Sequence, residues 1–212
     1  MSISTVPFGS DVAALYWTPS SETTLGYVAQ TSRNKGFAAH KFDDESGALK
    51  TLRFCLKAGH MSVFEFAQIV FRIECPIFVA RQLMRYRAAS YMERSLRYCA
   101  ATTSRGAWEL ADPSEASAYT AIDAHEKLSL SRYYALVEDG ERKELARAVL
   151  PLSTPTVFIM RVDLRELFHI FAERLSPHCQ TETRAVVEQM RLEAERAFPF
   201  SIANWFELYH KE

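Results

Sequence analysis

Apolar and polar side chains alternate most clearly in residues 62–75, which read SVFEFAQIVFRIEC. From position 69 onward, apolar residues recur at every second position, which is the period of a half-buried strand. Pro76 follows, and proline fits the first turn of a helix but not the middle of a sheet. The pattern therefore predicts one long strand over 62–75 with a helix beginning at Pro76. A shorter extended piece is expected at 155–162.

Most of the remaining pattern is helical, above all after Pro113. Residues 1–25 have no clear period and are expected to form an irregular arm or a weak strand, and the polar residues 88–105 a functional loop. Two helical pieces within 26–58 are expected to break near residues 34–36 and to end at Gly59. Later helices are expected at about 114–138, 141–150, 163–175, 180–197 and 201–210. Strands early and helices late predict an α+β domain.

Composition limits the class of function. The chain has 212 residues, 48% of them hydrophobic, which is enough for one sizeable core, so a single domain over 1–212 is expected. A formal net charge of −1 argues against binding of a nucleic acid polymer through bulk positive charge. The four cysteines form no CxxC pair and no zinc spacing, so no metal site is predicted. No apolar run has the length of a membrane span and no secretion signal is recognisable, so a cytoplasmic protein without a membrane partner is expected.

Arginines are concentrated in residues 81–97, where five lie within 17 residues. On a helix Arg81 and Arg85 would stack one turn apart, and like charges at that spacing repel. A bound phosphate would offset the repulsion, because arginine presents a planar fork suited to phosphate oxygens. The alternative is a solvated basic face. The apolar residues on the N-terminal side of the cluster argue against a face that is wholly solvated.

This segment resembles the signature of the flavin-dependent thymidylate synthases, which reads R-H-R and then S-x-N-E-x-S-x-R. The chain has R-Y-R at 85–87 and S-Y-M-E-R-S-L-R at 90–97, with the same spacing. Further blocks are similar to the family and follow in its order: G-H-M-S-V-F-E at 59–65, P-I-F-V-A-R-Q at 76–82, A-R-A-V-L-P at 146–151 and R-L-S-P-H-C-Q-T-E at 174–182. Separate matches in the right order, from about 26 to 205, argue against chance.

The resemblance implies an α+β fold with a mostly antiparallel central sheet flanked by helices, assembled as a homotetramer with sites at subunit interfaces. It also implies that FAD is held by Ser62, Arg85, Tyr86, Arg87, Glu93, Asp163, Arg165 and His169. Two of these positions have a structural alternative. Asp163 stands three residues before Glu166, which is the pattern of a helix cap. His169 is alternatively a buried, hydrogen-bonded core histidine.

A uridylate nucleotide is the implied substrate, held by Gln82, Arg85, Glu93, Arg94, Ser95, Arg97, Arg147 and Arg174, with Arg147 coming from a neighbouring subunit. Arg174 is the predicted catalytic residue. C5 of uracil becomes a nucleophile only if negative charge builds on the O4–N3–O2 system, and a fixed guanidinium at that edge stabilises it as an oxyanion hole does. The alternative is a surface ion pair of Arg174 with Glu173 or Glu182.

The implied reaction needs no protein nucleophile. NADPH reduces the bound FAD, methylenetetrahydrofolate gives the one-carbon unit, and the reduced flavin supplies the hydride that completes the methyl group. His60 is implied at the folate or nicotinamide face, or else is a loop hydrogen bonder. Cys179 lies in a stretch similar to the nucleophile motif of the cysteine-dependent synthases, but a cysteine is often just a small buried residue. Replacing Cys179 with Ala is expected to leave activity largely intact.

The chain departs from the family pattern at ligand positions: Tyr86 replaces the middle His of R-H-R, Met92 replaces Asn, Phe66 stands where His is usual, and Asp163 and His169 replace amides. Such changes on an ordinary scaffold are typical of a specialised paralogue, and relatives in nucleoside-antibiotic pathways methylate UMP. The expected acceptor is therefore dUMP, UMP or both. A non-catalytic paralogue that holds nucleotide or flavin is the second interpretation. An RNA-binding module, which rests only on residues 81–97, is remote.

Overall fold

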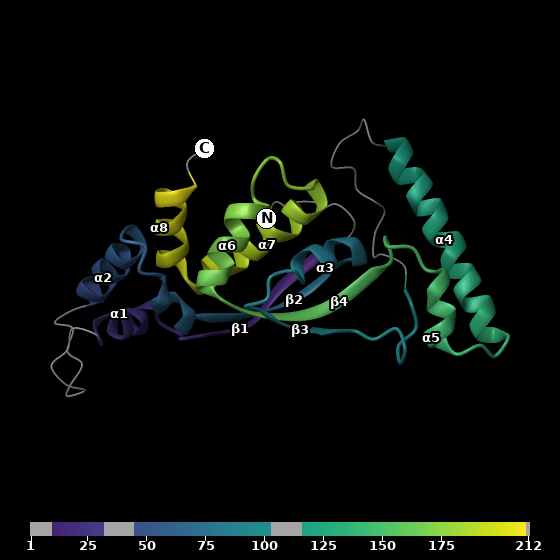
Figure 1. Ribbon diagram of the computed structural model, residues 1–212, viewed down its shortest axis with the longest axis horizontal. Coiled ribbons are helices and arrows are strands. Elements are labelled where there is room, and N and C mark those ends of the chain that lie inside the picture. The colour runs from purple at the N-terminus through teal and green to yellow at the C-terminus, as the bar shows by residue number, and fades with distance from the viewer. Residues whose placement is uncertain (1–9, 32–44, 103–115, 211–212) are drawn as a thin grey trace.

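A computed structural model describes residues 10–31, 45–102 and 116–210, and Figure 1 shows them as a sheet with some of the helices stacked on one side and others beyond its ends. The strands lie in the order β1-β2-β4-β3, and every neighbouring pair is antiparallel. They are β1 (Asp11–Thr18), β2 (Gln68–Pro76), β3 (Ser90–Glu93) and β4 (Pro155–Asp163). The α+β fold with an antiparallel sheet is thereby confirmed, and the N-terminal region contains a strand. The expected loop over 88–105 is wrong at Ser90–Glu93, which form β3.

The helices follow the predicted order. Gly59 ends the second helix as expected: its φ of 70° is one that a side chain would strain, and its N–H donates to the carbonyl of Leu56. The predicted break near residues 34–36 lies outside the described residues. The helices are α1 (Glu22–Gln30), α2 (Glu45–Lys57), α3 (Ile77–Leu83), α4 (Ala116–Glu138), α5 (Lys143–Ala146), α6 (Leu164–Arg174), α7 (Thr181–Ala197) and α8 (Pro199–Tyr209), with 3₁₀ helices η2 (Met61–Phe66) and η4 (Arg147–Val149).

The predicted strand over 62–75 is wrong in its first part, where η2 takes its place and β2 begins only at Gln68. Val63 and Phe64 are consecutive and both buried. Successive apolar residues fit a helical turn as well as a strand that is covered on both faces, so the apolar run 63–64 did not distinguish the two. The alternation is real further along, since Phe71 is buried in the core and Arg72 is partly exposed.

The main core lies between the sheet and helices α6, α7 and α8. Phe71 of β2, Phe158 of β4 and Phe171 of α6 are all at most 1% exposed. Phe168 of α6 stacks on Trp205 of α8, with the ring centroids 5.3 Å apart and the planes 1° from parallel. Each large side chain buried in this way contributes about 1.5–3 kcal/mol. This packing holds α6, and with it Arg174 at the C-terminal end of the helix, firmly against the sheet.

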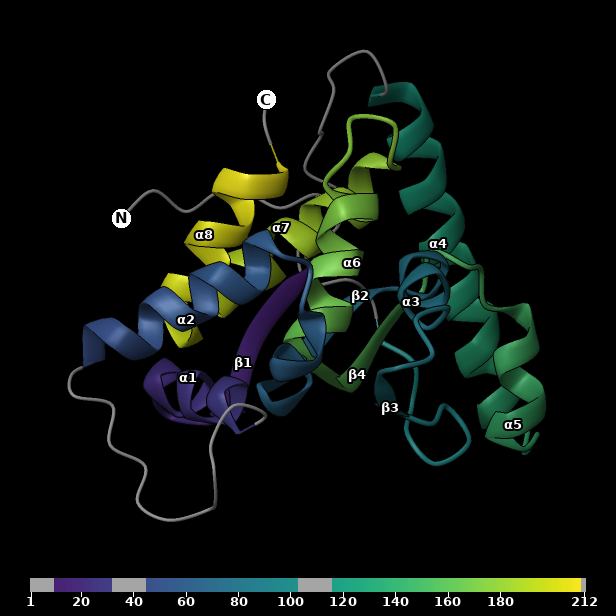
Figure 2. The same cartoon turned by 60° about the vertical axis from the view of Figure 1, so that its left-hand side comes forward.

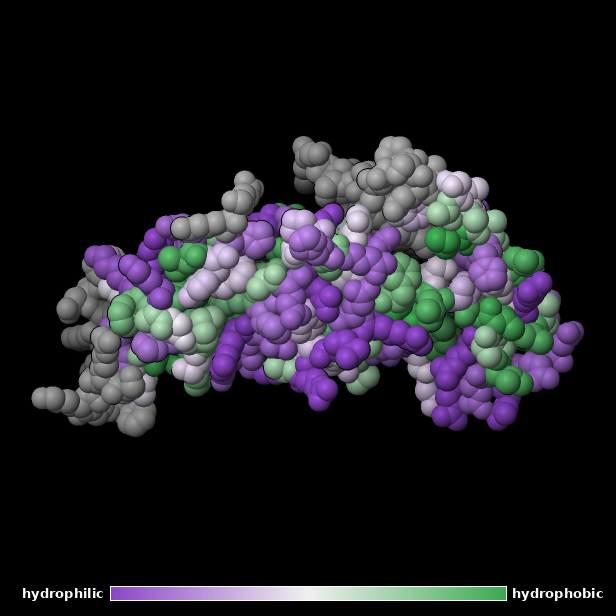
Figure 3. All heavy atoms as spheres, turned by 45° about the horizontal axis from the view of Figure 1, so that its top comes forward, coloured by the Kyte–Doolittle hydropathy of each residue, from purple (hydrophilic) through white to green (hydrophobic). Residues whose placement is uncertain are grey.

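Helices α4, α5 and η4, residues 116–149, form what we call the arm. Figures 1 and 2 both show α4 and α5 beside the remaining elements and not stacked on them, and we call residues 10–31, 45–93 and 155–210 the body. The arm packs around a small cluster of Ala101, Tyr133 and Ala146. Figure 3 shows hydrophobic residues gathered on its surface. The large apolar side chains that are 37–54% exposed there are Ile122, Leu128, Tyr134, Leu145 and Val149.

Candidate functional site

The turn after α3 places the R-Y-R motif with its outer residues in solvent and its middle residue inside. Arg85 and Arg87 are exposed, whereas Tyr86 is only 5% exposed. The N–H of Tyr86 donates to the carbonyl of Leu83, and the Tyr91 hydroxyl shares its one proton between the carbonyls of Leu83 and Tyr86 at 2.7 and 2.9 Å. The turn is thus fixed from two sides, and it presents two arginines with a buried phenol between them.

The Tyr86 hydroxyl joins this turn to the C-terminal end of α6. Arg174 donates from Nε to the phenol oxygen at 2.7 Å, and the phenol donates to Oε2 of Glu173 at 2.6 Å. Burial, and then the hydrogen bond to Glu173, raise the pKa of Tyr86, so the phenol keeps its proton. His169 packs edge-on against the Tyr86 ring, with the centroids 5.7 Å apart. The structure therefore brings Tyr86, His169 and Arg174 together.

Arg174 does not form the surface ion pair with Glu173 or Glu182 that was the alternative interpretation. Glu173 accepts from Tyr86 instead, and Glu182 accepts from the Tyr119 hydroxyl at 3.3 Å. Within the described residues, Arg174 has no carboxylate at ion-pair distance, and the Cys179 side chain lies beside its guanidinium. The guanidinium is part-buried and anchored at Nε, with no direct counter-ion. Such a group is suited to meet the carbonyl edge of a ligand.

Predicted flavin residues line the outer side of α6 and the neighbouring η2. Arg165 and His169 lie one turn apart on α6, and Arg165 forms an ion pair with Glu65 of η2, the helix that also carries the exposed Ser62. The side chain of His169 is 55% exposed, and its Nε2 lies 3.7 Å from Oε1 of Glu173. The interpretation of His169 as a buried core histidine is therefore wrong, and its ring stays accessible to a ligand.

Asp163 caps α6, as its spacing to Glu166 indicated. Its Oδ1 accepts from the backbone N–H of Glu166 at 2.8 Å. Burial raises the pKa of Asp163, the hydrogen bond from Glu166 opposes the rise, and the nearby charge of Glu65 adds to it. The carboxylate is therefore occupied by the helix, and it would repel a phosphate placed next to it.

The predicted nucleotide residues follow β3. Glu93 accepts from the Thr156 hydroxyl at 2.7 Å, across the β3–β4 pair. The backbone N–H of Arg94 donates to the carbonyl of Val157 at 2.8 Å, and the Arg94 side chain donates to Thr102 at 3.4 Å. The Nε of Arg94 is buried and has no hydrogen-bond partner in the part of the chain that the structure describes. An orphaned buried donor of this kind is what a bound acceptor would satisfy.

Further along, the segment after β3 meets the arm. Ser95 accepts from the backbone N–H of Arg97 at 3.2 Å, and Arg97 pairs with Glu144 of α5 at 2.9 Å. Arg147 is exposed in η4 and forms no ion pair with another described residue. Figures 1 and 2 show α6 over the sheet and α5 apart from it, beyond one end of the sheet. One chain therefore does not bring Arg147 to Arg174.

Two further predicted site residues are Gln82, which lies near Arg174, and His60, which lies next to η2. The amide of Gln82 in α3 donates to Gln180 at the start of α7, which ties α3 to the loop after Arg174. His60 is exposed just before η2, with its ring 6.0 Å from that of Phe54. Gln82 therefore joins the group around Arg174, whereas His60 lies at the η2 end.

Several partners in the site were not predicted as site residues. Glu65 and Gln180 lie inside the matched blocks 59–65 and 174–182, so the sequence contained a signal for them. Glu173 was considered only as an ion-pair partner of Arg174, and its contact with Tyr86 depends on the fold. Thr156, the partner of Glu93, lies in an extended segment with no motif of its own.

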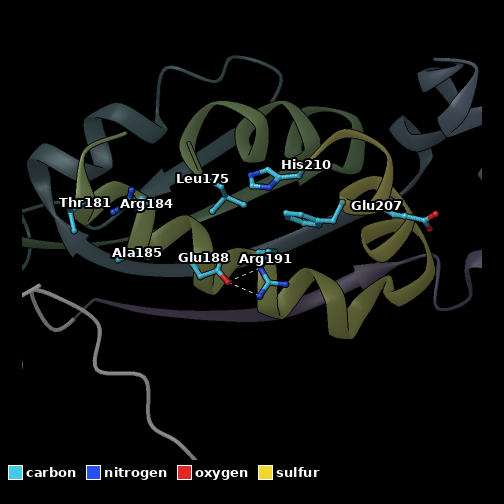
Figure 4. A pocket seen from close by; sticks show the side chains of 9 residues that line it. Leu175, Thr181, Arg184, Ala185, Glu188, Arg191, Glu207 and His210 are labelled. Atoms are coloured by element: carbon cyan, nitrogen blue, oxygen red, sulfur yellow. Dashed lines mark hydrogen bonds and ion pairs between the residues drawn. The ribbon is translucent and has the colours of Figure 1, made fainter. Parts of the chain in front are cut away.

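A hollow of about 780 Å³ opens along α7 and α8 (Figure 4), and no predicted site residue lines it. Arg191, which projects from its wall, is paired with Glu188 and Glu195 at 2.6 and 2.9 Å. Glu207 at its rim is paired with Arg53. Arg191 and Glu207 are therefore already neutralised by pairs within the protein. Among the described residues, no group of three His, Cys, Asp or Glu side chains could hold a metal ion, and no helix is long and apolar enough to cross a membrane.

Comparison with known proteins adds an independent finding. A family model described as thymidylate synthase complementing protein matches residues 14–200. A flavin-dependent thymidylate synthase from Pseudothermotoga lettingae is 36% identical over 170 residues, covering 76% of this chain and 75% of that protein. Another from Gluconobacter oxydans is 32% identical over 211 residues, covering 87% and 67%. The crystal structure of the UMP/dUMP methylase PolB from Streptomyces cacaoi bound with 5-Br dUMP matches with a TM-score of 0.81 at 23% identity, covering 93% of this chain and 95% of that one, which shows a shared fold.

Proposed function

Because this chain belongs to the thymidylate synthase complementing protein family, we propose that it is a methyltransferase that adds a methyl group to C5 of a uridylate. The proposal takes FAD as cofactor and methylenetetrahydrofolate and NADPH as co-substrates, in keeping with relatives that are flavin-dependent thymidylate synthases. The observation that supports it is the environment of the Arg174 guanidinium. Its guanidinium is part-buried, anchored at Nε by Tyr86, and not neutralised by a carboxylate among the described residues.

Arg174 is the proposed catalytic residue. Attack by C5 of uracil builds negative charge on the O4–N3–O2 edge, and a guanidinium held beside that edge lowers the free energy of the charged state. Loss of one such donor costs about 10²–10³-fold in rate in other enzymes. The flavin, when bound, supplies the hydride that completes the methyl group. The protein then contributes orientation, charge stabilisation and exclusion of water, and it needs no nucleophile.

The residues around the R-Y-R turn fit a flavin. Arg85 and Arg87 are exposed, and neither forms an ion pair within the described part of the chain, so their charges are available to the pyrophosphate. We propose that they act with Ser62, Arg165 and His169, which line α6 and η2. Asp163 is left out of this set because its carboxylate caps α6.

The nucleotide is proposed to bind between two subunits. Gln82, Glu93, Arg94, Ser95 and Arg97 come from one chain, and the orphaned Nε of Arg94 is a donor that a ligand oxygen would satisfy. Arg147 lies on the arm, in η4, apart from α6 and its C-terminal Arg174, and we propose that it completes the site of a second copy. The exposed apolar side chains of the arm support an assembly, and we propose the homotetramer that the family resemblance implies.

The test is an anaerobic assay with FAD, NADPH, methylenetetrahydrofolate and either dUMP or UMP, read by mass for the gain of one methyl group. Methylation of dUMP alone would identify a thymidylate synthase that tolerates Tyr86 and Met92, and methylation of both would identify a UMP/dUMP methylase. Arg174→Ala is expected to lower the rate by about 10²–10³-fold. Arg196→Ala, in the last turn of α7 and paired with Glu193, is the control and is expected to keep full activity.

A different result would favour the second interpretation. If the purified protein is yellow and bleaches with NADPH but methylates neither nucleotide, the proposed reaction is wrong. The protein would then be a flavin-binding or nucleotide-binding paralogue without this turnover.

A further inference from the structure

Tyr86 occupies the position between two exposed arginines, and its ring is almost completely buried. A side chain that is 5% exposed presents little surface to a large planar cofactor. Its hydroxyl instead points to the last two residues of α6. The family resemblance implies a flavin contact at this position, but the contacts of Tyr86 within the protein indicate a different task.

The two hydrogen bonds of the Tyr86 hydroxyl have only one consistent direction. A guanidinium has donors and no acceptor, so the phenol oxygen must accept from Nε of Arg174. The single phenol proton is then left for Glu173, whose carboxylate can only accept when ionised. The chain of bonds runs from Arg174 through Tyr86 to Glu173, and every member uses the role that its chemistry allows.

This arrangement restricts the motion of Arg174. Nε–H lies in the plane of the delocalised guanidinium, so its hydrogen bond leaves that plane free to turn only about the Nε–H···O axis. The Tyr86 ring limits this rotation further, because Cζ of Arg174 lies 5.5 Å from its centroid, within the range of a cation–π contact. His169 supports the ring from the side at a centroid distance of 5.7 Å. The terminal nitrogens of Arg174 are thereby presented in one orientation.

We propose that Tyr86 is a positioning residue that acts through Arg174, and that Glu173 anchors the phenol in turn. This inference rests on the proposed function, in which Arg174 stabilises charge on the uracil edge. A displaced guanidinium would still carry its charge, but it would meet that edge at the wrong angle. Misplacement of about 1 Å in a catalytic group can cost about 100-fold in rate.

The first variant is Tyr86→Phe, which removes the hydroxyl and keeps the ring. We expect kcat to fall by about 10- to 100-fold, while the Kd for FAD and the KM for the uridylate change by less than about threefold. Tyr209→Phe is the matched control, because it also removes a hydroxyl that donates a hydrogen bond, in this case to the carbonyl of Leu56, and it lies outside the site. It is expected to keep the wild-type kcat. A tighter or weaker Kd for FAD with unchanged kcat would show a flavin contact and overturn the proposal.

A double-mutant cycle separates positioning from an independent contribution. Arg174→Lys removes Nε and the planar fork, so Tyr86 has nothing left to orient. In that background Tyr86→Phe is expected to lower kcat by less than about twofold. An equally large loss in both backgrounds would mean that Tyr86 acts independently of Arg174. If Tyr86→Phe proves unstable, Glu173→Ala replaces it in the cycle with an expected loss of about 3- to 10-fold, because Glu173 is half exposed.

The clamp can also be observed without turnover. In protein labelled with ¹⁵N-arginine, the Nε–H resonance of Arg174, assigned through Arg174→Lys, should exchange slowly with solvent in the wild type and rapidly in Tyr86→Phe. Equal exchange in both would overturn the clamp. If the wild type binds flavin but does not methylate a uridylate, the proposed function fails, and this measurement still decides the clamp by itself.

Discussion

The body and the arm bury their apolar side chains to very different extents. In the body, the sheet and helices α6, α7 and α8 enclose a continuous core that includes Phe71, Phe158 and Phe171. In the arm, the only described cluster has three buried members, around Tyr133. The arm leaves five large apolar side chains 37–54% exposed, and the body also leaves some exposed, among them Tyr16, Phe66 and Met92. The body therefore has an extensive core of its own, whereas the arm has little core, and we expect the arm to gain more from contact with a second copy.

The same contrast applies to the candidate site. Arg174, Tyr86 and Glu173 are joined inside the body by hydrogen bonds that one chain makes alone. Arg147 lies in the arm, exposed and without an ion pair to any other described residue. The body thus supplies Arg174, held in place by hydrogen bonds. The arm supplies the positive charge of Arg147, which is not neutralised by any other described residue of the same chain. The predictions below test this division.

The largest expected effect is on the stability of the body. Phe171→Ala should lower the free energy of unfolding by about 3–5 kcal/mol, because it leaves a cavity in a closely packed core. The matched change in the arm, Tyr133→Ala, removes a ring that is equally buried but has few buried neighbours. It should loosen α4 locally and leave the sheet protected. Denaturant unfolding at one fixed protein concentration, combined with hydrogen exchange, measures both.

This comparison would break if Tyr133→Ala destabilised the sheet as much as Phe171→Ala does. Hydrogen exchange would then rise in β2 and β4 together with α4. Such a result would show that the arm and the body unfold as one cooperative unit, and that the small cluster around Tyr133 is not separate from the main core.

The second prediction concerns the shared site. Arg147→Ala should lower the methylation rate by about 10- to 100-fold, as expected for a charged hydrogen bond to a phosphate. Arg174→Ala should be at least as severe. If the two variants are dissociated, mixed and reassembled, about a quarter of the sites should combine an intact arm with an intact body, and activity should return. Arg132→Ala, exposed on the same arm, is the control and should be fully active.

Mixing that restores no activity would contradict the shared site. The two arginines would then have to act within one chain, which requires a large rearrangement of the arm relative to the body. The mass of the mixed particles, measured at the same time, excludes a simple failure to reassemble.

Much of the body could be predicted from the sequence because its signals are local. The spacing of Asp163 and Glu166 indicated a helix cap, and Gly59 indicated a helix end, and both are present. The strand over 62–75 failed where Val63 and Phe64 are both buried, because a short apolar run does not distinguish a helical turn from a strand. A local sequence pattern predicts the structure of a segment only when the residues that determine it are neighbours both in sequence and in space.

The clamp on Arg174 could not be predicted in this way. Tyr86 lies 87 and 88 residues from its two hydrogen-bond partners, and only the fold brings the turn after α3 to the end of α6. The role of the arm is even harder to predict from the sequence, since the position of Arg147 relative to a ligand depends on a second chain. A family motif can assign these residues to one site, but their distances and directions require a structure.

The third prediction tests the apolar surface of the arm. Leu145→Glu places a charge on a side chain that is 54% exposed in the single chain and that we expect to be covered in the assembly. Association should weaken by about tenfold or more, and light scattering after size exclusion should show a smaller particle. Leu192→Glu, at a 39% exposed position of α7 in the body, is the control and should leave the particle mass unchanged. The opposite ranking would move the subunit contact from the arm to α7.

The smallest expected effect concerns helix caps, which differ between the two regions. In the body α6 is capped by Asp163, whereas α5 in the arm begins after Arg142 without a side-chain cap. Asparagine caps a helix as well as aspartate does, so Asp163→Asn should change the free energy of unfolding by at most about 0.5 kcal/mol at neutral pH. Asp163→Ala, which removes the cap, should cost about 1 kcal/mol.

The pH dependence of the Asp163→Asn variant carries a definite sign. Burial raises the pKa of Asp163 in the folded protein, so between the ordinary aspartate pKa of about 3.9 and that raised value the folded state binds more protons than the unfolded state. The stability of the wild type should therefore fall relative to Asp163→Asn as the pH rises through this window, and urea titrations at several pH values measure the difference. If the wild type instead gained stability over the same range, the positive charges of Arg161 and Arg165 and the N-terminus of α6 would outweigh burial, and the carboxylate would stabilise the body in its charged form.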